Sequence, residues 1–306
     1  MTPPHGWLIL DKPLGLGSTQ AVGAVKRNLR EAGYGKVKTG HGGTLDPLAS
    51  GVLPIALGEA TKLAGRMLGS DKVYEFTVAF GAETDTLDLE GKVVAQSDHR
   101  PTLAQVEAIL PRFTGAIEQV PPAFSALMID GQRAYDRARA GEEVEMPFRQ
   151  VTIYQLYQSR EDRVKETMED LSLVAHVSKG TYIRSLARDI ARALGTVGHV
   201  TYLRRTRAGP FALDTAISLD MLNEIGKGAR LENSLLPLEA GLDGIPALDL
   251  GPEQARAVHQ GRVLTGLAFQ DGVCWARCGD RPLALMQVDG GNATVLRGFN
   301  LPDTAE

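Results

Sequence analysis

The apolar residues of this chain recur with two different periods, which together predict both strands and helices. Residues 73–80 alternate, and Tyr74 and Phe76 fall on the same apolar face, as in a half-buried strand. Residues 171–177 repeat this alternation, and residues 7–10 form a short apolar run typical of a buried strand. Because strands and helices follow one another without a regular βαβ rhythm, the pattern predicts an α+β fold.

Three segments carry apolar residues at helical spacing. One helix is predicted from Ser18, a residue suited to the N-cap, and a second starts at Pro101. A third follows Gly180 and stops at Gly195. Between the second and third helices, residues 121–148 are rich in charge and turn-forming residues, which predicts a surface excursion.

The pattern changes after residue 240, and a chain of 306 residues is long enough for one large and one small domain. We expect the first domain to span residues 1–240 and the second residues 245–306. The second domain has a short helix at about 252–260, followed by glycine-punctuated apolar runs over 263–296. These short runs predict a small β-barrel or sandwich.

Composition adds few constraints beyond a water-soluble globular class. The chain is 43% hydrophobic and 23% charged, and no apolar run approaches the roughly 18 residues that span a membrane. Its first residues lack the features of a signal peptide, so we expect a cytoplasmic protein without membrane contact. The two cysteines, Cys274 and Cys278, lack the further ligands of a zinc site, and we expect neither metal nor cofactor.

The net charge of −4 argues against a nucleic-acid partner, but its distribution does not. Residues 26–38 hold five basic side chains against one acidic, and residues 179–207 hold seven against one. In the second range Arg184, Arg188 and Arg192 recur every fourth residue, as on one stripe of a helix. Such runs are typical of RNA-steering patches and equally of ordinary solvated helix faces, and the charges alone leave both readings open.

The segment 40–54, GHGGTLDPLASGVLP, has the composition of neither an amphipathic helix nor a strand. Its glycines permit close backbone approach to a ligand, and Pro47 biases Asp46 toward an extended backbone. A rigid loop of small residues is what a positioned catalytic carboxylate requires. Asp in such a loop also commonly caps a turn, so the residues alone leave both roles for Asp46 open.

Segment 40–54, with the LGEATK that follows at 57–62, closely resembles the signature of the TruB family of tRNA pseudouridine synthases. Further blocks of this resemblance follow in family order within residues 7–240: DKVY (71–74), GAETDTLD (81–88), PPAFSA (121–126), GQRAY (131–135), SKGTYIR (178–184) and YLRR (202–205).

The resemblance implies a pseudouridine synthase fold over residues 1–240, with a central mixed, mainly antiparallel sheet flanked by helices. Residues 121–148 resemble the insertion with which stand-alone members of this family clasp RNA. The tail, residues 245–306, is similar to the small β-barrel-like, RNA-binding PUA domain that ends many members. The TruB-like part therefore implies a catalytic domain, and the tail an accessory RNA-binding domain.

The implied reaction converts a uridine in the T loop of tRNA, at the family's position 55, to pseudouridine. In the family the aspartate matching Asp46 is the nucleophile, a known form of covalent catalysis. Its attack on C6 of the uracil or on C1′ of the ribose stays open. The arginine matching Arg184 pairs with this aspartate in the family, and the alternative role for Arg184 is a phosphate contact on its basic helix face.

The resemblance also implies the side chains that hold the base. Tyr74 matches the tyrosine that packs against it, although a tyrosine so placed is ordinarily core. Tyr182 and Leu203 match positions that close the base pocket. His41 matches the histidine that fills the gap left by the everted base, and its alternative is an exposed loop histidine.

Three basic residues, Lys62, Lys179 and Arg204, are expected to contact the RNA. The expected partner is tRNA, held through its T loop and acceptor region by shape, stacking and phosphate contacts, by a monomer that needs no protein partner. One rival is an RNA chaperone with an idle carboxylate. Another is a guide-RNA-dependent relative with protein partners, and the intact insertion at 121–148 argues against it.

Overall fold

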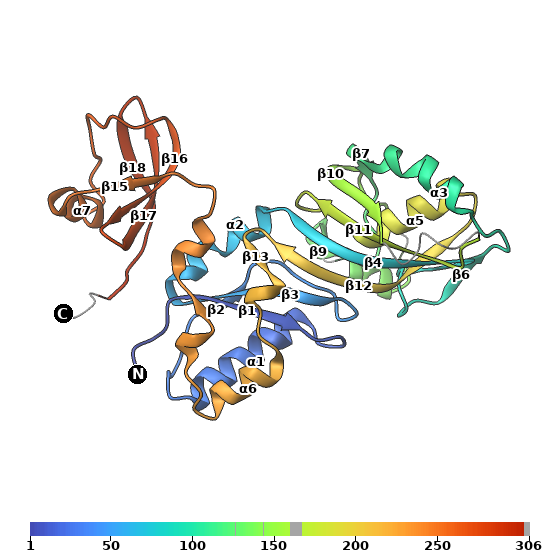
Figure 1. The fold of residues 1–306 in the computed structure, drawn as a ribbon, viewed down its shortest axis with the longest axis horizontal. Coiled ribbons are helices and arrows are strands. Elements are labelled where there is room, and N and C mark those ends of the chain that lie inside the picture. Colours follow the sequence, from blue (N-terminus) through green and yellow to red (C-terminus); the bar gives the residue numbers. More distant parts are fainter. Residues whose placement is uncertain (126, 143, 160–166, 303–306) are drawn as a thin grey trace.

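A computed structural model describes residues 1–125, 127–142, 144–159 and 167–302 (Figure 1). Ala126 of the motif at 121–126, residue 143 of the insertion and the last four residues of the expected second domain lie outside the described residues. None of the described helices is long and apolar enough to cross a membrane.

One ten-stranded sheet forms the body of the molecule, in the order β14-β1-β3-β12-β4-β11-β10-β7, with β13 paired to β12 and β2 paired to β3. Its strands are β1 (Gly6–Lys12), β2 (Thr39–His41), β3 (Ser50–Leu57), β4 (Lys72–Phe80), β7 (Gly115–Gln119), β10 (Arg149–Gln158), β11 (Asp170–Val177), β12 (Gly198–Ala208), β13 (Phe211–Ala212) and β14 (Leu235–Leu236). Two hairpins lie outside it: β5 (Ala82–Thr84) with β6 (Val93–Gln96), and β8 (Met128–Ile129) with β9 (Gln132–Arg133).

The sheet is mixed and mainly antiparallel, as predicted. Its one parallel pairing joins β12 to β3, with Arg204 opposite Ser50 and Arg205 opposite Gly51. This pairing places β12, near residue 205, beside β3, the strand that follows Asp46 in the sequence. It is the contact through which the two halves of the sheet meet.

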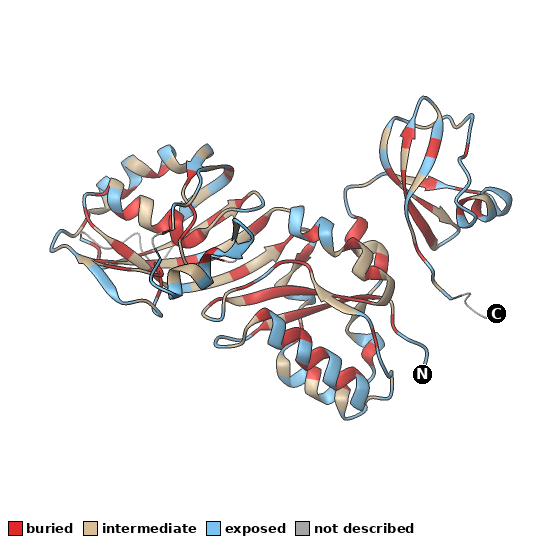
Figure 2. Cartoon of the chain, turned by 180° about the vertical axis from the view of Figure 1, so that it is seen from behind, coloured by how far each residue is buried: buried red, intermediate tan, exposed pale blue. Residues whose placement is uncertain are grey.

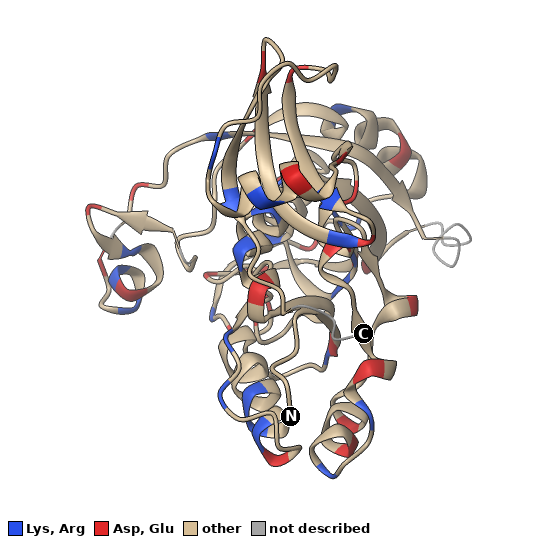
Figure 3. Ribbon diagram, turned by 90° about the vertical axis from the view of Figure 1, so that its left-hand side faces the viewer, with Lys and Arg blue, Asp and Glu red and all other residues tan. Residues whose placement is uncertain are grey.

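Helices cover both halves of the sheet (Figure 1). They are α1 (Ser18–Glu31), α2 (Ala64–Gly69), α3 (Leu103–Ile109), α4 (Ala134–Arg139), α5 (Ile183–Ala193), α6 (Leu219–Gly226) and α7 (Pro252–His259), with 3-10 turns η1 (Gly58–Leu63), η2 (Leu110–Phe113), η4 (Leu213–Thr215), η5 (Leu231–Asn233) and η6 (Leu238–Leu242). The outer side of α1 carries several basic residues (Figure 3), and Lys26, Arg27 and Arg30 are exposed there.

Two predicted helix starts need correction. The N-cap of α1 is Gly17 rather than Ser18, because the Ser18 hydroxyl is engaged with the backbone of Leu45. The helix expected from Pro101 begins at Leu103, where the Thr102 side chain accepts a hydrogen bond from a backbone N–H of the first turn. The cap of α1 thus lies one residue before the expected position, and α3 begins two residues after it.

The buried residues form separate cores on the two halves of the sheet (Figure 2). Strand β4 packs Phe76 against α5, whose Leu186 and Ile190 are fully buried. A second core joins α1 and α6 to β1 and β3. Burial of each such side chain contributes about 1.5–3 kcal/mol. Tyr74 and Leu203 pack partly buried against both cores, so they lie where the two halves meet.

The C-terminal part is a four-stranded sheet in the order β15 (Ala247–Asp249), β16 (Gly272–Cys278), β17 (Arg281–Asp289) and β18 (Asn292–Gly298), with α7 beside it. It has its own buried cluster. A further cluster joins Leu285 and Phe299 of this part to Trp7 of β1, so the two parts share apolar contacts. The boundary near residue 240 stays a prediction.

Candidate active site

Asp46 lies on the irregular loop between β2 and β3, at the edge of a pocket of about 350 Å³. The pocket walls come from the Asp46 loop, from β4, β11 and β12, from the start of α5 and from the base of the insertion. Its lining residues are Gly43, Thr44, Leu45, Asp46, Ala49, Leu68, Lys72, Tyr74, Ser125, Leu127, Val177, Ser178, Gly180, Thr181, Tyr182, Ile183, Arg184, Leu203 and Arg205. The structure thus brings together five of the residues that the sequence singled out: Asp46, Tyr74, Tyr182, Arg184 and Leu203.

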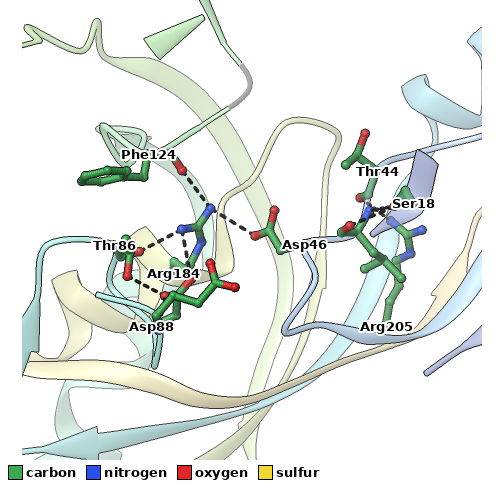
Figure 4. Close-up of polar contacts among 10 residues, drawn as sticks. Ser18, Thr44, Asp46, Thr86, Asp88, Phe124, Arg184 and Arg205 are labelled. Atoms are coloured by element: carbon green, nitrogen blue, oxygen red, sulfur yellow. Dashed lines mark hydrogen bonds and ion pairs between the residues drawn. The ribbon is translucent and has the colours of Figure 1, made fainter. Parts of the chain in front are cut away.

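The Arg184 guanidinium lies between two carboxylates (Figure 4). Nη2 is 3.1 Å from Oδ2 of Asp46, and Nη1 is 3.1 Å from Oδ2 of Asp88. Nη1 also donates to the Thr86 carbonyl and Nη2 to the Phe124 carbonyl. The residue is only 7% exposed, so its nitrogens face protein oxygens and not the helix surface where a phosphate contact would lie.

The second carboxylate, Asp88, was not singled out from the sequence. Asp88 is buried, and its Oδ1 accepts hydrogen bonds from the Thr86 hydroxyl and from the Glu90 N–H. The preceding Leu87 has φ of +62°, a left-handed conformation that is costly for a branched side chain and that persists only when its surroundings enforce it. The only sequence signal for Asp88 was its place at the end of the GAETDTLD block.

The aromatic and apolar walls hold their positions by contacts outside the pocket. The Tyr182 backbone is fixed by Gln119, whose side-chain amide donates to the Tyr182 carbonyl and accepts from its N–H. The Arg149 guanidinium lies 5.4 Å from the centre of the Tyr182 ring. Tyr74 both packs on the core and lines the pocket, so a place in the core is compatible with a place beside a bound base.

His41 lies on β2, next to the Asp46 loop, but it is not among the residues that line the pocket. Its Nδ1 is buried and has no hydrogen-bond partner among the described residues. Burial lowers the pKa of His41, and the nearby charge of Arg205 lowers it further. The imidazole is therefore neutral at physiological pH.

The three expected RNA contacts lie outside the pocket. Lys62 donates to a Glu59 carboxylate oxygen and to the Gly298 carbonyl, which ties η1 to the C-terminal part. Arg204 pairs with Asp11 at 2.7 Å. Lys179 is exposed beside the pocket wall. Their contacts with RNA stay predictions.

Two further cations, Lys72 and Arg205, line the pocket and were missed as individual residues. Both are buried. Burial lowers the pKa of Lys72 to about 8, as it does for the nearby Lys12, and the charge of Arg205 adds to both effects. Lys72 Nζ donates to backbone carbonyls of the turn before β4.

A metal centre has no support in the part of the chain that the structure describes, where no group of three His, Cys, Asp or Glu residues could hold an ion. Cys274 and Cys278 are free thiols, and burial raises the pKa of Cys274.

Comparison with known proteins gives this site a family. Residues 29–183 match the model of the TruB family pseudouridylate synthase N-terminal domain, and residues 184–243 match that of the tRNA pseudouridylate synthase B C-terminal domain. The chain is 69% identical to tRNA pseudouridine synthase B of Novosphingobium aromaticivorans, over 98% of this chain and 99% of that protein. It is 58% identical to the protein of the same name in Zymomonas mobilis, over 97% and 96% of the two chains.

A solved structure shares the fold as well. It is an H/ACA RNP bound to a substrate RNA containing 2′-deoxyuridine, and it matches with a TM-score of 0.73 and 25% identity, over 98% of this chain and 86% of that chain. The two family models together match residues 29–243, and both relatives match over nearly the whole chain. The chain belongs to the TruB family of pseudouridylate synthases.

Proposed function

We propose that this chain isomerises a uridine in the T loop of tRNA to pseudouridine, with Asp46 as the nucleophile. The observation that carries the proposal is the Asp46 carboxylate, held at the edge of a base-sized pocket by Arg184, which Asp88 holds in turn. The relatives named tRNA pseudouridine synthase B support tRNA as the substrate.

The geometry of Asp46 suits covalent catalysis. Its Oδ2 pairs with Arg184, whereas Oδ1 has no partner among the described residues and is available for attack. In the reaction the N1–C1′ bond breaks, the C5–C1′ bond forms, the C5 proton leaves and N1 gains a proton. Attack on C6 would hold the detached uracil as a covalent adduct of Asp46. Attack on C1′ would form the adduct with the ribose and leave the uracil between the pocket walls.

The walls suit an everted pyrimidine. Tyr74, Tyr182 and Leu203 supply apolar and aromatic surface on which a base can pack. A neutral His41 beside the pocket suits insertion into the RNA stack, which would offset part of the few kcal/mol that eversion of a base costs. The insertion at 121–148 and the PUA-like C-terminal part would grip the T loop and the acceptor region.

Replacement of Asp46 by Asn tests the nucleophile. Release of tritium from tRNA labelled at C5 of uridine should vanish, while tRNA affinity stays within about threefold, because the amide keeps the size of the side chain but is a poor nucleophile. Unchanged tritium release would contradict the proposal, and tRNA binding without release in the wild-type protein would favour an RNA chaperone.

The guide-RNA-dependent alternative is tested by an assay that contains neither guide RNA nor protein partners. The purified chain alone should convert a uridine of an unmodified tRNA transcript, and mass mapping after incubation should place the product in the T loop. Conversion that requires added guide RNA or protein partners would reject a stand-alone enzyme.

A further inference from the structure

The loop that carries Asp46 is irregular, yet one buried side chain binds it at two consecutive carbonyls. Arg205 Nη2 donates to the Gly43 carbonyl at 3.0 Å, and Nη1 donates to the Thr44 carbonyl at 3.2 Å. Nε donates to the Val52 carbonyl on β3 at 2.8 Å. One rigid guanidinium thus connects the segment before Asp46 to the strand after it (Figure 4).

The pairing of two strands of the sheet sets the position of Arg205. Strand β12 runs parallel to β3 with Arg205 opposite Gly51, whose φ is +102°. A Cβ at Gly51 would lie 2.1 Å from the Arg205 carbonyl oxygen, so only glycine permits this approach. The glycine in the family signature therefore has a structural reason, which is to admit Arg205.

Ser18 fixes the other side of the same loop. Its hydroxyl donates to the Leu45 carbonyl and accepts from the Leu45 N–H, both at 2.8 Å. The Leu45 carbonyl belongs to the peptide bond that leads into Asp46, so its orientation is fixed directly. Ser18 is itself buried at the start of α1.

The remaining carbonyls of the loop are bonded too. The Asp46 carbonyl accepts from the Ala49 N–H at 3.0 Å, and the Pro47 carbonyl accepts from the Gly15 N–H at 2.8 Å. Every carbonyl from residue 43 to residue 47 thus has a donor. The backbone oxygens of this segment are therefore bonded although it has no regular secondary structure.

The use of a buried arginine to hold this loop costs folding free energy. It is 1% exposed and forms no ion pair with an acidic side chain of the described residues, so its charge is offset by carbonyl dipoles alone. Burying a cation without a counter-ion costs folding free energy. A neutral residue would serve a purely structural purpose at lower cost, which points to a role in placing the nucleophile.

We propose that Arg205 is a positioning residue for Asp46, which acts through the carbonyls of Gly43, Thr44 and Val52, with Ser18 as the second anchor of the loop. The inference rests on the proposed role of Asp46 as nucleophile. Arg184 aims the carboxylate itself, whereas Arg205 and Ser18 fix the backbone from which the carboxylate extends.

The test measures the single-turnover rate of tritium release at saturating enzyme, and separately the dissociation constant for tRNA. Arg205→Met and Arg205→Lys should each lower the rate about 100-fold, because displacement of a catalytic group by about 1 Å has an effect of that order. Lysine keeps the charge, but a single nitrogen cannot reach all three carbonyls. Ser18→Ala should lower the rate about tenfold, and all three variants should keep the dissociation constant within about threefold.

Phe211→Leu is the control for lost stability. Phe211 is buried on β13, which pairs with β12, its ring packs on Trp7, and it is not among the residues that line the pocket. This variant should melt at a lower temperature and keep the wild-type rate when assayed folded. An equal loss of rate in Phe211→Leu would assign the effect of the Arg205 variants to stability.

Three other outcomes overturn the proposal. They are a folded Arg205→Lys variant with the wild-type rate, a rate and an affinity that fall by the same factor, and, should the Arg205 variants not fold, a wild-type rate in Ser18→Ala. A wild-type protein that releases no tritium would instead reject the proposed function, so the two failures are distinguishable.

Discussion

Two groups of cations in this chain look alike in the sequence and lie in opposite environments. The outer cations, Lys26, Arg27, Arg30, Lys36 and Lys38, are exposed on α1 and the loop after it, and none of them forms an ion pair with a described acidic residue. The inner cations, Lys12, Lys72, Arg184 and Arg205, are buried around the pocket. Of these two groups, only the outer one is exposed to solvent.

The difference teaches how such charges are used. Phosphate binding needs a solvated cation that can exchange water and counter-ions for RNA. The inner cations instead donate to carbonyls and carboxylates of the catalytic loop and its neighbours, so they shape the pocket. A count of basic residues along the sequence does not distinguish the two uses.

The basic range 179–207 follows the second pattern more than the first. Arg188 pairs with Asp189, Arg192 with Glu83, Arg204 with Asp11 and Arg207 with Asp71. Of the seven basic residues in that range, all of which the structure describes, Lys179 alone has neither an ion pair nor a backbone carbonyl as partner. Of the two basic ranges, the one at residues 26–38 therefore offers more exposed cations without a partner among the described residues.

The largest effect is expected for Arg184→Met. This variant tests whether Arg184 acts as an inner cation of the pocket or as a phosphate contact. The change leaves two carboxylates without their shared guanidinium and should lower the rate of tritium release about 100- to 1000-fold. The salt dependence of tRNA binding should not change. A decrease of about 1 in the slope of log affinity against log salt, with the rate at saturation intact, would instead make Arg184 a phosphate contact.

The next effect tests the outer cations. Reversal of two charges on one face of α1, by Lys26→Glu with Arg30→Glu, should weaken tRNA binding about tenfold and make the salt slope shallower by about 2. The rate at saturating enzyme should stay unchanged. Lys227→Glu at the C-cap of the adjacent α6 is the control, because Lys227 already pairs with Glu224. An equal loss per reversed charge in the control would show that overall charge, and not the α1 surface, governs binding.

A separate effect, on stability and not on binding, concerns the buried Lys72. Its pKa in the folded protein is about 8, below the unfolded value near 10.5, so between these values only the unfolded chain keeps the proton. The free energy of unfolding of the wild type should therefore rise with pH across this window. From pH 7 to pH 9.5, denaturant titrations should show a gain of about 2 kcal/mol relative to Lys72→Met. A constant difference between the two proteins would mean that Lys72 titrates as an exposed lysine does.

The smallest effect is expected for Arg192→Met, which removes a pair with Glu83 on the surface of α5. Because the Arg192 side chain is 56% exposed, the free energy of unfolding should fall by only about 0.5–1 kcal/mol, or about 2 °C in melting temperature. Affinity for tRNA should be unchanged. A loss of affinity as large as that of the α1 variant would place Arg192 among the RNA contacts.

Parts of the site were predictable because they depend on local pattern. The composition of segment 40–54 marked Asp46, and the resemblance led to its partner Arg184, which the structure places 3.1 Å away. The alternation of β4 placed Tyr74 on the apolar face that ends at the pocket. Each of these predictions used residues close together in the sequence or matched one by one to a family motif.

Other parts depend on which face of an element meets which neighbour. Arg204 and Arg205 are adjacent on β12 and point to opposite faces, and the sequence does not say which face borders the pocket. The sequence singled out Arg204, which pairs with Asp11, and not Arg205, which binds the loop that carries Asp46. Asp88 lies 42 residues after Asp46 in the sequence, and only the structure shows that both carboxylates pair with the Arg184 guanidinium.

The sequence by itself determined the mixture of strands and helices, the irregular loop that carries Asp46 and the family, because these follow from periodicity, from glycine and proline at fixed positions and from motif order. The tertiary structure alone decided which cations are buried, which carbonyls they bind and which acids neutralise the others. Burial and pairing are set by contacts between segments far apart in the chain, and a linear charge pattern carries no information on those distances.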